Sequence, residues 1–320
     1  MFPKSPHRPP ASRRRKWWRG AIIILGFTLL LLAGSVIAYS LIISPPDGFF
    51  KGSAARKEGV YTVLLCGTDN NVQTDAIMVA SLDTKAQKVT VLNIPRDTMV
   101  NVERTNKKIN GAYGAGGIEN LYNEISTVIG FKPDNYVIVN LKGLTSLIDT
   151  IGGVTFNVPI DMYYDDPEQN LSIHISGGLQ PLNGNQATNV FRFRQNNDGT
   201  GYPRGDLQRI ETQQALIKEL AKKILRLENV GKAREFAAIF NKNVKSDLSF
   251  DKMLWYFNQL LLVGSDNINF FTLPCELGFY QELSYVYVNE EEALPIINMI
   301  NPYLKDRTID HLDIIKLGKK

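Results

Sequence analysis

Two segments of this chain, about a hundred residues apart, place arginines beside acidic residues. The first is L-N-I-P-R-D-T at residues 92–98, and the second is F-R-F-R-Q-N-N-D-G-T-G-Y-P-R-G-D-L-Q-R-I-E-T-Q at residues 191–213. Guanidinium groups bind phosphate oxygens through planar pairs of donors. The pattern therefore predicts a cationic site for a multiply charged anion, most simply a phosphate.

The local sequence indicates how these arginines are presented. Pro95 has no amide hydrogen, so the strand expected at residues 88–95 should end there and project Arg96 and Asp97 from the rim of a sheet. Arg192 and Arg194 are two residues apart, and in a strand they would share one face. Two adjacent guanidinium groups repel unless an anion lies between them. A pair of surface arginines on an edge strand is the plain alternative.

A further group of candidates falls on one face of a helix expected at residues 207–227. Asp206, Arg209 and Gln213 stand at positions i, i+3 and i+7, near the first turns of that helix. Backbone amides and the helix dipole favour an anion there. A solvated ion pair within one helix would have the same spacing.

Asp69 and Asp75 flank the turn between the first two expected strands. The turn can bring two hard oxygen ligands together, and Mg²⁺ favours such a site because water and substrate phosphates complete its coordination. Two aspartates that only cap a polar turn would look the same in the sequence.

The charge distribution separates a basic tail from a slightly acidic body. Seven of the 36 lysines and arginines lie in residues 1–20, which contain no acid, so the rest of the chain holds 29 basic and 32 acidic residues. A broad nucleic-acid-binding face needs excess positive charge on the folded surface. We therefore predict no nucleic-acid partner.

A run of 23 residues without a charge, residues 21–43, follows the tail. At about 1.5 Å per residue, such a helix crosses a hydrocarbon core of about 30 Å. The basic residues before it predict a cytoplasmic tail at residues 1–20 and an external body. A cleaved signal peptide is the rival interpretation, but its apolar region would be shorter, about 7–15 residues. Residues 44–59, which contain prolines and glycines, are predicted to be a linker.

Short apolar runs separated by polar turns begin near Val60 and predict the folded body. Strands are expected at residues 60–67, 75–83, 88–95, 136–140, 154–159, 269–273 and 284–288, and helices at 118–129, 141–150, 207–227, 253–263 and 290–304. These elements predict a three-layer α/β/α sandwich with a mixed central sheet, preceded by a single transmembrane helix. Cys66 and Cys275 lie in apolar runs, and we expect free buried thiols, although a disulfide between them stays open.

Eight short motifs follow one another in colinear order across roughly residues 62–225. They are G-T-D at 67–69, T-D-A-I-M at 74–78, I-P-R-D-T at 94–98, K-K-I-N-G-A-Y at 107–113, I-G-G-V at 151–154, L-N-G-N-Q-A at 182–187, R-F-R at 192–194 and D-L-Q-R-I-E-T-Q at 206–213. The set resembles the LytR-CpsA-Psr family, and the catalytic domain expected from the resemblance spans residues 60–310.

The resemblance implies a single-pass type II protein of the Gram-positive cell membrane, with an extracellular catalytic domain. Members of this family are phosphotransferases that move an anionic glycopolymer, such as teichoic acid or capsule, from a polyprenyl pyrophosphate carrier to peptidoglycan. The implied partners are the lipid-linked polymer, peptidoglycan and membrane lipid, and the implied cofactor is Mg²⁺.

The resemblance also implies roles for individual residues. It makes Asp69 and Asp75 the Mg²⁺ ligands, and it assigns Asp75 to the acceptor hydroxyl, although a metal ligand is an indifferent base. The implied catalytic residues are Asp75, Arg96, Arg192 and Arg194. The implied pyrophosphate-binding residues are Arg96, Asp97, Lys108, Arg192, Arg194, Arg204, Asp206, Arg209 and Gln213.

The sequence departs from the family pattern in a few places. Asn70 and Asn71 stand where an arginine usually follows the first aspartate, and Thr212 stands where an arginine commonly precedes the glutamine. Residues 195–205 form a longer segment than usual, and Arg204 within it is a candidate replacement for a missing guanidinium. These departures concern substrate selectivity more than the reaction.

Two other classes of function stay open. A non-catalytic module that binds polyprenyl phosphate or wall polymer could use the same cationic groove without reacting, and turnover would distinguish it from an enzyme. A regulator of envelope gene expression that binds DNA is disfavoured by the acidic body and by a tail of 20 residues, which is too short for a helix-turn-helix.

Overall fold

The computed structural model describes residues 45–46, 55–69, 73–168, 171–224, 226 and 232–317. The chain divides into two compact units, residues 1–45 and residues 46–320, and the second contains nearly all of the described residues. The predicted tail and membrane span, and residues 44 and 47–54 of the predicted linker, lie outside the described residues. Within the described ranges, no helix combines the length and apolar character needed to cross a membrane.

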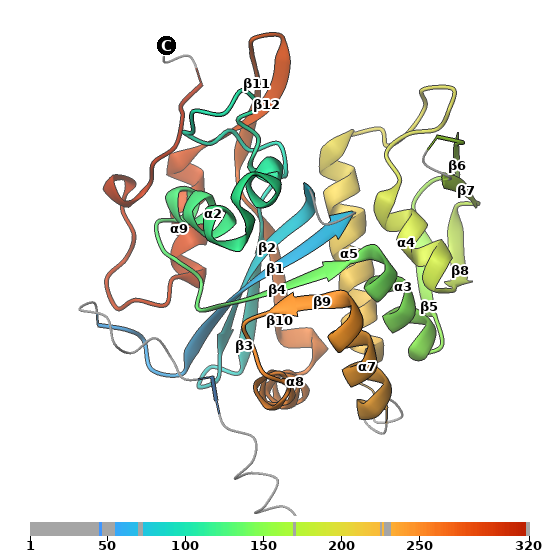
Figure 1. The fold of residues 1–320 in the computed structure, drawn as a ribbon, viewed down its shortest axis with the longest axis horizontal. Coiled ribbons are helices and arrows are strands. Elements are labelled where there is room, and N and C mark those ends of the chain that lie inside the picture. The colour runs from blue at the N-terminus through green and yellow to red at the C-terminus, as the bar shows by residue number, and fades with distance from the viewer. Residues whose placement is uncertain are drawn as a thin grey trace, which may run out of the picture. The chain divides into compact units, whose positions relative to one another are not determined.

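A six-stranded mixed sheet forms the centre of the second unit, in the order β10-β3-β2-β1-β4-β9 (Figure 1). Its strands are β1 (Val60–Asp69), β2 (Gln73–Asp83), β3 (Lys88–Asn93), β4 (Asn135–Asn140), β9 (Val244–Ser246) and β10 (Ile268–Thr272). β1 is parallel to β4 and β3 is parallel to β10, whereas β2 is antiparallel to both β1 and β3. The carboxyl ends of β1, β3, β4 and β10 therefore meet along one edge of the sheet.

Most of the predicted strands are confirmed to within a few residues, namely those at 60–67, 75–83, 88–95, 136–140, 154–159 and 269–273. The strand predicted at 284–288 also exists, but it does not join the central sheet. It forms a separate hairpin, β11 (Cys275–Tyr280) with β12 (Leu283–Val288). Pro274 stands between β10 and this hairpin, and a proline cannot donate to a sheet ladder.

Helices cover both faces of the sheet and confirm the α/β/α arrangement (Figure 1). One face packs against α2 (Ala112–Ile129) and α9 (Glu290–Ile300), and fully buried side chains such as Leu64, Ile77 and Leu121 form the core between them. The other face carries α3 (Leu141–Thr150), α5 (Asp206–Ile224), α7 (Ala233–Asn243) and α8 (Phe250–Val263). Three short 3-10 turns are η1 (Ile109–Gly111), η2 (Ser265–Asn267) and η3 (Ile309–His311).

A second hydrophobic core lies beside the sheet. It is enclosed by two antiparallel strand pairs and three helices. These are β5 (Val154–Val158) with β8 (Gly178–Leu182), β6 (Met162–Asp166) with β7 (Leu171–Ile175), α4 (Gly184–Arg192), α3 and α5. We call β5 to β8 together with α4 the lobe. Gly184 allows α4 to lie close to α3, because a Cβ at that position would stand 2.2 Å from the carbonyl oxygen of Thr145.

The two cysteines are free thiols, as predicted. Cys66 is buried within the central sheet, and Cys275 is partly buried at the start of β11. Burial raises the pKa of the Cys66 thiol above its usual range, and burial also raises the pKa of Cys275 to about 12. Both groups are therefore protonated at neutral pH, and this domain is held together by its cores rather than by a disulfide.

Candidate active site

A cavity of about 670 Å³ opens at the sheet edge where β1 ends and β2 begins, between the sheet, the lobe and α5. Its polar lining comes from Thr68, Gln73, Asp75, Arg96, Arg192, Arg194, Gln195, Arg209 and Gln213. Its apolar lining includes Leu141, Tyr164, Leu171, Ile173, Phe191 and Phe193. The two arginine-bearing segments that are distant in the sequence therefore meet in one cavity.

A β-bulge directs Asp75 into this cavity. Gly67 pairs with Ala76 and Thr68 pairs with Thr74, so Asp75 has no residue opposite it in β1. Simple alternation would place Asp75 on the same side of the sheet as Ile77, which is buried in the core under α2 and α9. The extra residue of a bulge bends its strand and redirects side chains, which explains why Asp75 and Ala76 both line the cavity.

Arg96 and Asp75 form the central ion pair of the cavity. Arg96 Nη1 donates to Asp75 Oδ1 over 2.7 Å, and Arg194 Nη2 lies 3.9 Å from the same oxygen. β3 ends at Asn93, and Arg96 follows Pro95, as predicted from the missing amide hydrogen of proline. The Arg96 side chain is only 14% exposed, and its Nε is buried without a hydrogen-bond partner among the described residues. This guanidinium is therefore held in place while part of its donor capacity stays unused.

Arg192 and Arg194 both line the cavity, but the predicted strand around them is wrong. Arg192 is the last residue of α4, and Phe193 is the helix C-cap, with extended backbone angles of φ −59° and ψ 139°. The fully buried Phe193 ring packs edge to face on Tyr202, with 5.6 Å between the ring centroids. A helix end followed by an extended residue thus brings the two arginines to the cavity.

α5 contributes Arg209 and Gln213 to the cavity, which confirms that these two residues share one face of a helix. Arg209 is 7% exposed. Gln213 Nε2 donates to the carbonyl oxygen of Phe191 over 2.9 Å and so connects α5 to the end of α4. Asp206 is the first residue of α5, and its side chain lies outside the description.

Three other predicted residues lie outside the cavity lining. Lys108 Nζ pairs with Asp97 Oδ1 at 3.2 Å and also stands 5.6 Å from the centre of the Tyr285 ring. Arg204 forms an ion pair with Glu211, which lines a second cavity of about 650 Å³ between α5 and the lobe. Arg204 is therefore placed beside the neighbouring cavity rather than where it could replace a guanidinium of the first.

The long segment after Arg194 forms a compact loop of its own. Gln195 and Gly201 form an isolated β-bridge, and Asn196 N donates to the carbonyl oxygen of Thr200 over 2.7 Å. Gln195 lines the cavity, as do Gln73 and Tyr164, and the sequence prediction missed all three. Only the position of Gln195 next to an arginine motif could have suggested it.

The predicted metal site is described in part. Asp69 is the last residue of β1 and pairs with Gln73, but its side chain lies outside the description. The Asp75 carboxylate is 41% exposed in the cavity, and nearby Thr68 Oγ1 is buried without a partner among the described residues. Hard oxygen donors of this kind fit Mg²⁺, which takes its other ligands from water and phosphates. In the described part of the chain, no group of three or more His, Cys, Asp or Glu side chains could hold a metal ion.

Comparison with known proteins gives relatives of similar sequence. Biofilm regulatory protein A of Streptococcus mutans is 28% identical over 283 residues, which cover 80% of this chain and 67% of that protein. The polyisoprenyl-teichoic acid–peptidoglycan teichoic acid transferase TagU of Enterococcus faecalis is 28% identical over 246 residues, which cover 72% of this chain and 76% of the transferase.

Comparison with solved structures supports the fold. The crystal structure of Bacillus subtilis TagV superposes with a TM-score of 0.64 at 21% sequence identity, covering 81% of this chain and all of that one. The model of the LytR_cpsA_psr family matches residues 45–300, which include both the sheet and the lobe. The chain therefore belongs to the LytR_cpsA_psr family.

Proposed function

We propose that this protein is a membrane-anchored phosphotransferase that moves an anionic glycopolymer from a polyprenyl pyrophosphate carrier to peptidoglycan. The observation that carries the proposal is the cavity that Arg96, Arg192, Arg194 and Arg209 line together with Asp75. Four guanidinium groups in one partly apolar cavity suit a ligand with several phosphate oxygens. The similarity to a protein named as a teichoic acid transferase supports a polymer of that class.

The proposed reaction is a single displacement at phosphorus. A sugar hydroxyl oxygen of peptidoglycan attacks the phosphorus that carries the polymer, and a new phosphodiester bond forms. The bond from that phosphorus to the bridging oxygen breaks, and polyprenyl phosphate leaves with the electron pair. The proton of the hydroxyl passes to the carboxylate of Asp75. The arginines stabilise the charge that grows on the phosphate oxygens, which is the dominant form of catalysis in such reactions.

Asp69 and Asp75 are the residues that would hold Mg²⁺ in this proposal. When bound, the ion would offset charge on the pyrophosphate and polarise the phosphate oxygens. Arg96 would keep its own contact with Asp75, because the carboxylate has two oxygens and only Oδ1 faces this guanidinium at 2.7 Å.

The apolar wall of the cavity fits the lipid part of the donor. Leu171 and Ile173 come from β7, and Phe191 and Leu141 come from the ends of α4 and α3. These side chains lie in the same cavity as the arginines, so a molecule with a charged pyrophosphate next to an isoprenoid chain could contact both kinds of surface.

Localisation follows from the charge pattern of the amino-terminal residues. We propose that residues 21–43 span the cell membrane, that residues 1–20 are cytoplasmic and that residues 44–320 are external. Protease added to intact protoplasts should then degrade the body of the protein. Degradation only after lysis would contradict this orientation.

Turnover tests the proposed reaction against the non-catalytic alternative. The full chain in detergent would be mixed with a farnesyl pyrophosphate-linked saccharide, cell-wall fragments and Mg²⁺, and free farnesyl phosphate would be measured. We expect release that needs both the enzyme and the wall acceptor, with label from the saccharide appearing on the wall. Tight binding of the donor without any release would support a binding module and contradict the phosphotransferase.

A further inference from the structure

The loop from Arg96 to Gly111 connects β3 with α2 and folds back on itself. Met99 and Lys108 form an antiparallel bridge, Val100 N donates to the carbonyl oxygen of Lys107 over 3.0 Å, and Ile109 N donates to that of Thr98 over 2.9 Å. We call residues 96–111 the return loop. Arg96, at the beginning of the loop, lines the cavity.

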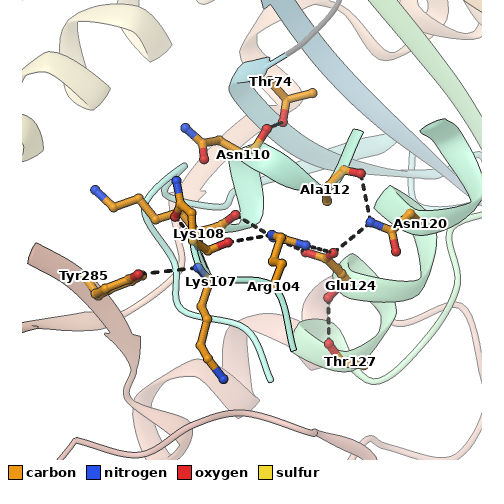
Figure 2. Close-up of polar contacts among 11 residues, drawn as sticks. Thr74, Arg104, Lys107, Lys108, Asn110, Ala112, Asn120, Glu124, Thr127 and Tyr285 are labelled. Carbon is orange, nitrogen blue, oxygen red and sulfur yellow. Dashed lines mark hydrogen bonds and ion pairs between the residues drawn. The ribbon is translucent and has the colours of Figure 1, made fainter. Parts of the chain in front are cut away.

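Arg104 lies near the middle of the return loop, where the chain turns back. Its side chain binds backbone carbonyl groups of the half that leads to α2. Its Nε donates to the carbonyl oxygen of Asn106 and its Nη2 donates to that of Lys108, both over 2.6 Å. Figure 2 shows the Arg104 guanidinium between the Lys108 backbone and the Glu124 side chain. Because a guanidinium is planar, these contacts together fix the orientation of the loop relative to α2.

Glu124 anchors Arg104 to α2. Its carboxylate accepts from both terminal nitrogens of Arg104, with 2.8 Å between Arg104 Nη2 and Glu124 Oε2, and it also accepts from Asn120 Nδ2 over 2.9 Å. Glu124 is 4% exposed. A buried ion pair is weak evidence for stability, since apolar residues of similar size often serve as well. The geometry that this pair imposes is therefore its more informative property.

The returning half of the loop connects this ion pair to the cavity. Asn110 N donates to the carbonyl oxygen of Arg96 over 3.1 Å, and the carbonyl oxygen of Asn110 accepts from Thr74 Oγ1 over 3.3 Å. Figure 2 shows Thr74 beside Asn110, and Thr74 is the residue before Asp75 in the sequence. Asn110 is therefore hydrogen-bonded both to Arg96 and to Thr74, the neighbour of Asp75. It connects the two sides of the central ion pair.

We propose that Arg104 and Glu124 are positioning residues, which hold the return loop in the conformation that presents Arg96 to the phosphates of the donor. This inference rests on the proposed function, since it assumes that Arg96 binds those phosphates. Neither Arg104 nor Glu124 lines the cavity. They act on the ligand only through Arg96, by way of Lys108 and Asn110.

A double-mutant cycle tests the coupling. Arg104→Lys keeps the positive charge, but a single ammonium group cannot satisfy two carbonyl oxygens and a carboxylate in one plane. We expect Arg104→Lys to weaken the affinity for inorganic pyrophosphate and to lower kcat/KM at least about fivefold, whereas in an Arg96→Ala background it should change either quantity less than twofold. Calorimetry with inorganic pyrophosphate and the release of farnesyl phosphate give the two readouts.

Arg56→Lys is the matched control. Arg56 Nη2 pairs with Asp134 Oδ2 at 2.7 Å, and both side chains are more than nine-tenths buried. We expect Arg56→Lys to destabilise the fold without moving Arg96. It should lower the melting temperature and leave kcat/KM within twofold of the wild-type value. Asn120→Ala serves as a milder second variant if Arg104→Lys does not fold, because it removes one donor from Glu124.

The outcomes separate the two proposals. If Arg96→Ala leaves pyrophosphate affinity and turnover unchanged, the proposed function of the cavity is wrong. If Arg96→Ala lowers affinity and turnover, but Arg104→Lys lowers kcat/KM by the same factor in the wild-type and Arg96→Ala backgrounds, the positioning role is wrong and the proposed function stands. If Arg104→Lys lowers kcat/KM and pyrophosphate affinity in the wild-type background but not in the Arg96→Ala background, the positioning role is supported.

Discussion

Replacing Asp75 by asparagine removes one negative charge from the cavity and keeps the size of the side chain. Two acidic ligands that only repel each other would be relieved by this change, and the protein would become more stable. The structure indicates the opposite sign, because Asp75 Oδ1 accepts from Arg96 at 2.7 Å and has Arg194 at 3.9 Å. Asp75→Asn would remove the negative charge that lies beside these two guanidinium groups.

The size of the effect follows from the exposure of the pair. A hydrogen bond to a charged group contributes about 1.5–3 kcal/mol to stability. The Asp75 side chain is 41% exposed, so solvent screening reduces this contribution to about 1 kcal/mol. For a domain of this size, that loss lowers the melting temperature by about 2–4 °C. Activity should fall far more, by about 100-fold to 1,000-fold, since charge placed at the reacting phosphates is lost.

Thermal unfolding of the full chain in detergent and release of farnesyl phosphate would measure the two effects. Asp83→Asn is the matched control, because Asp83 ends the same strand at the opposite edge of the sheet. Among the described residues, its side chain accepts from the local backbone amides of Lys85 and Ala86. We expect normal turnover from the control. A higher melting temperature for Asp75→Asn would show that repulsion, not pairing with Arg96, dominates at this carboxylate. Normal turnover by Asp75→Asn would refute its place in the reaction.

Three further predictions concern the cavity, the thiols and the helix contact. Arg192→Ala and Arg194→Ala should each lower polymer transfer by about 100-fold or more without a large change in melting temperature; wild-type levels of wall-linked polymer from both variants, in a strain without related enzymes, would contradict the phosphate site. Burial raises the pKa of the Cys66 thiol, so above about pH 8.5 the folded state keeps a proton that the unfolded state releases, and the free energy of unfolding should fall by about 1.4 kcal/mol per pH unit. Urea titrations should show a smaller fall of this free energy with pH for Cys66→Ala. The same dependence on pH in the variant and the wild type would exclude this thiol as the cause. Gly184→Ala should lower the urea midpoint strongly, because the new Cβ would stand 2.2 Å from the Thr145 carbonyl oxygen, and an unchanged midpoint would mean that the two helices separate easily.

Sequence patterns predicted the elements whose signals are local. The helix expected at residues 141–150 is present with those bounds, and Asn140 caps it by accepting from Gly143 N over 2.8 Å. Asn183 and Gln186 form a capping box that begins α4, and this signal was available in L-N-G-N-Q-A. It outweighs the alternation in F-R-F-R, which is why the strand predicted there is wrong.

The site was predictable in its residue types but not in its geometry. Asp75, Arg96, Arg192, Arg194, Arg209 and Gln213 come together in one cavity, as the family resemblance implied. A β-bulge leaves no mark in the strand pattern, so the redirection of Asp75 could not be anticipated. β6 and β7 were missed, although the alternation L-S-I-H-I at residues 171–175 is a strand signal, and the contribution of Ile173 to the cavity was missed with them.

The cavity is bounded by two hydrophobic cores that share no residue. Asp75 and Arg96 extend from the sheet that contains the first core, whereas Arg192, Arg194 and Arg209 come from elements that enclose the second. Substitutions within one core are therefore expected to be nearly independent of those within the other. In the proposed reaction, the lobe could change its shape to admit a different polymer while the sheet keeps Asp75 and Arg96 in place, so one reaction could persist through a change of the transferred polymer.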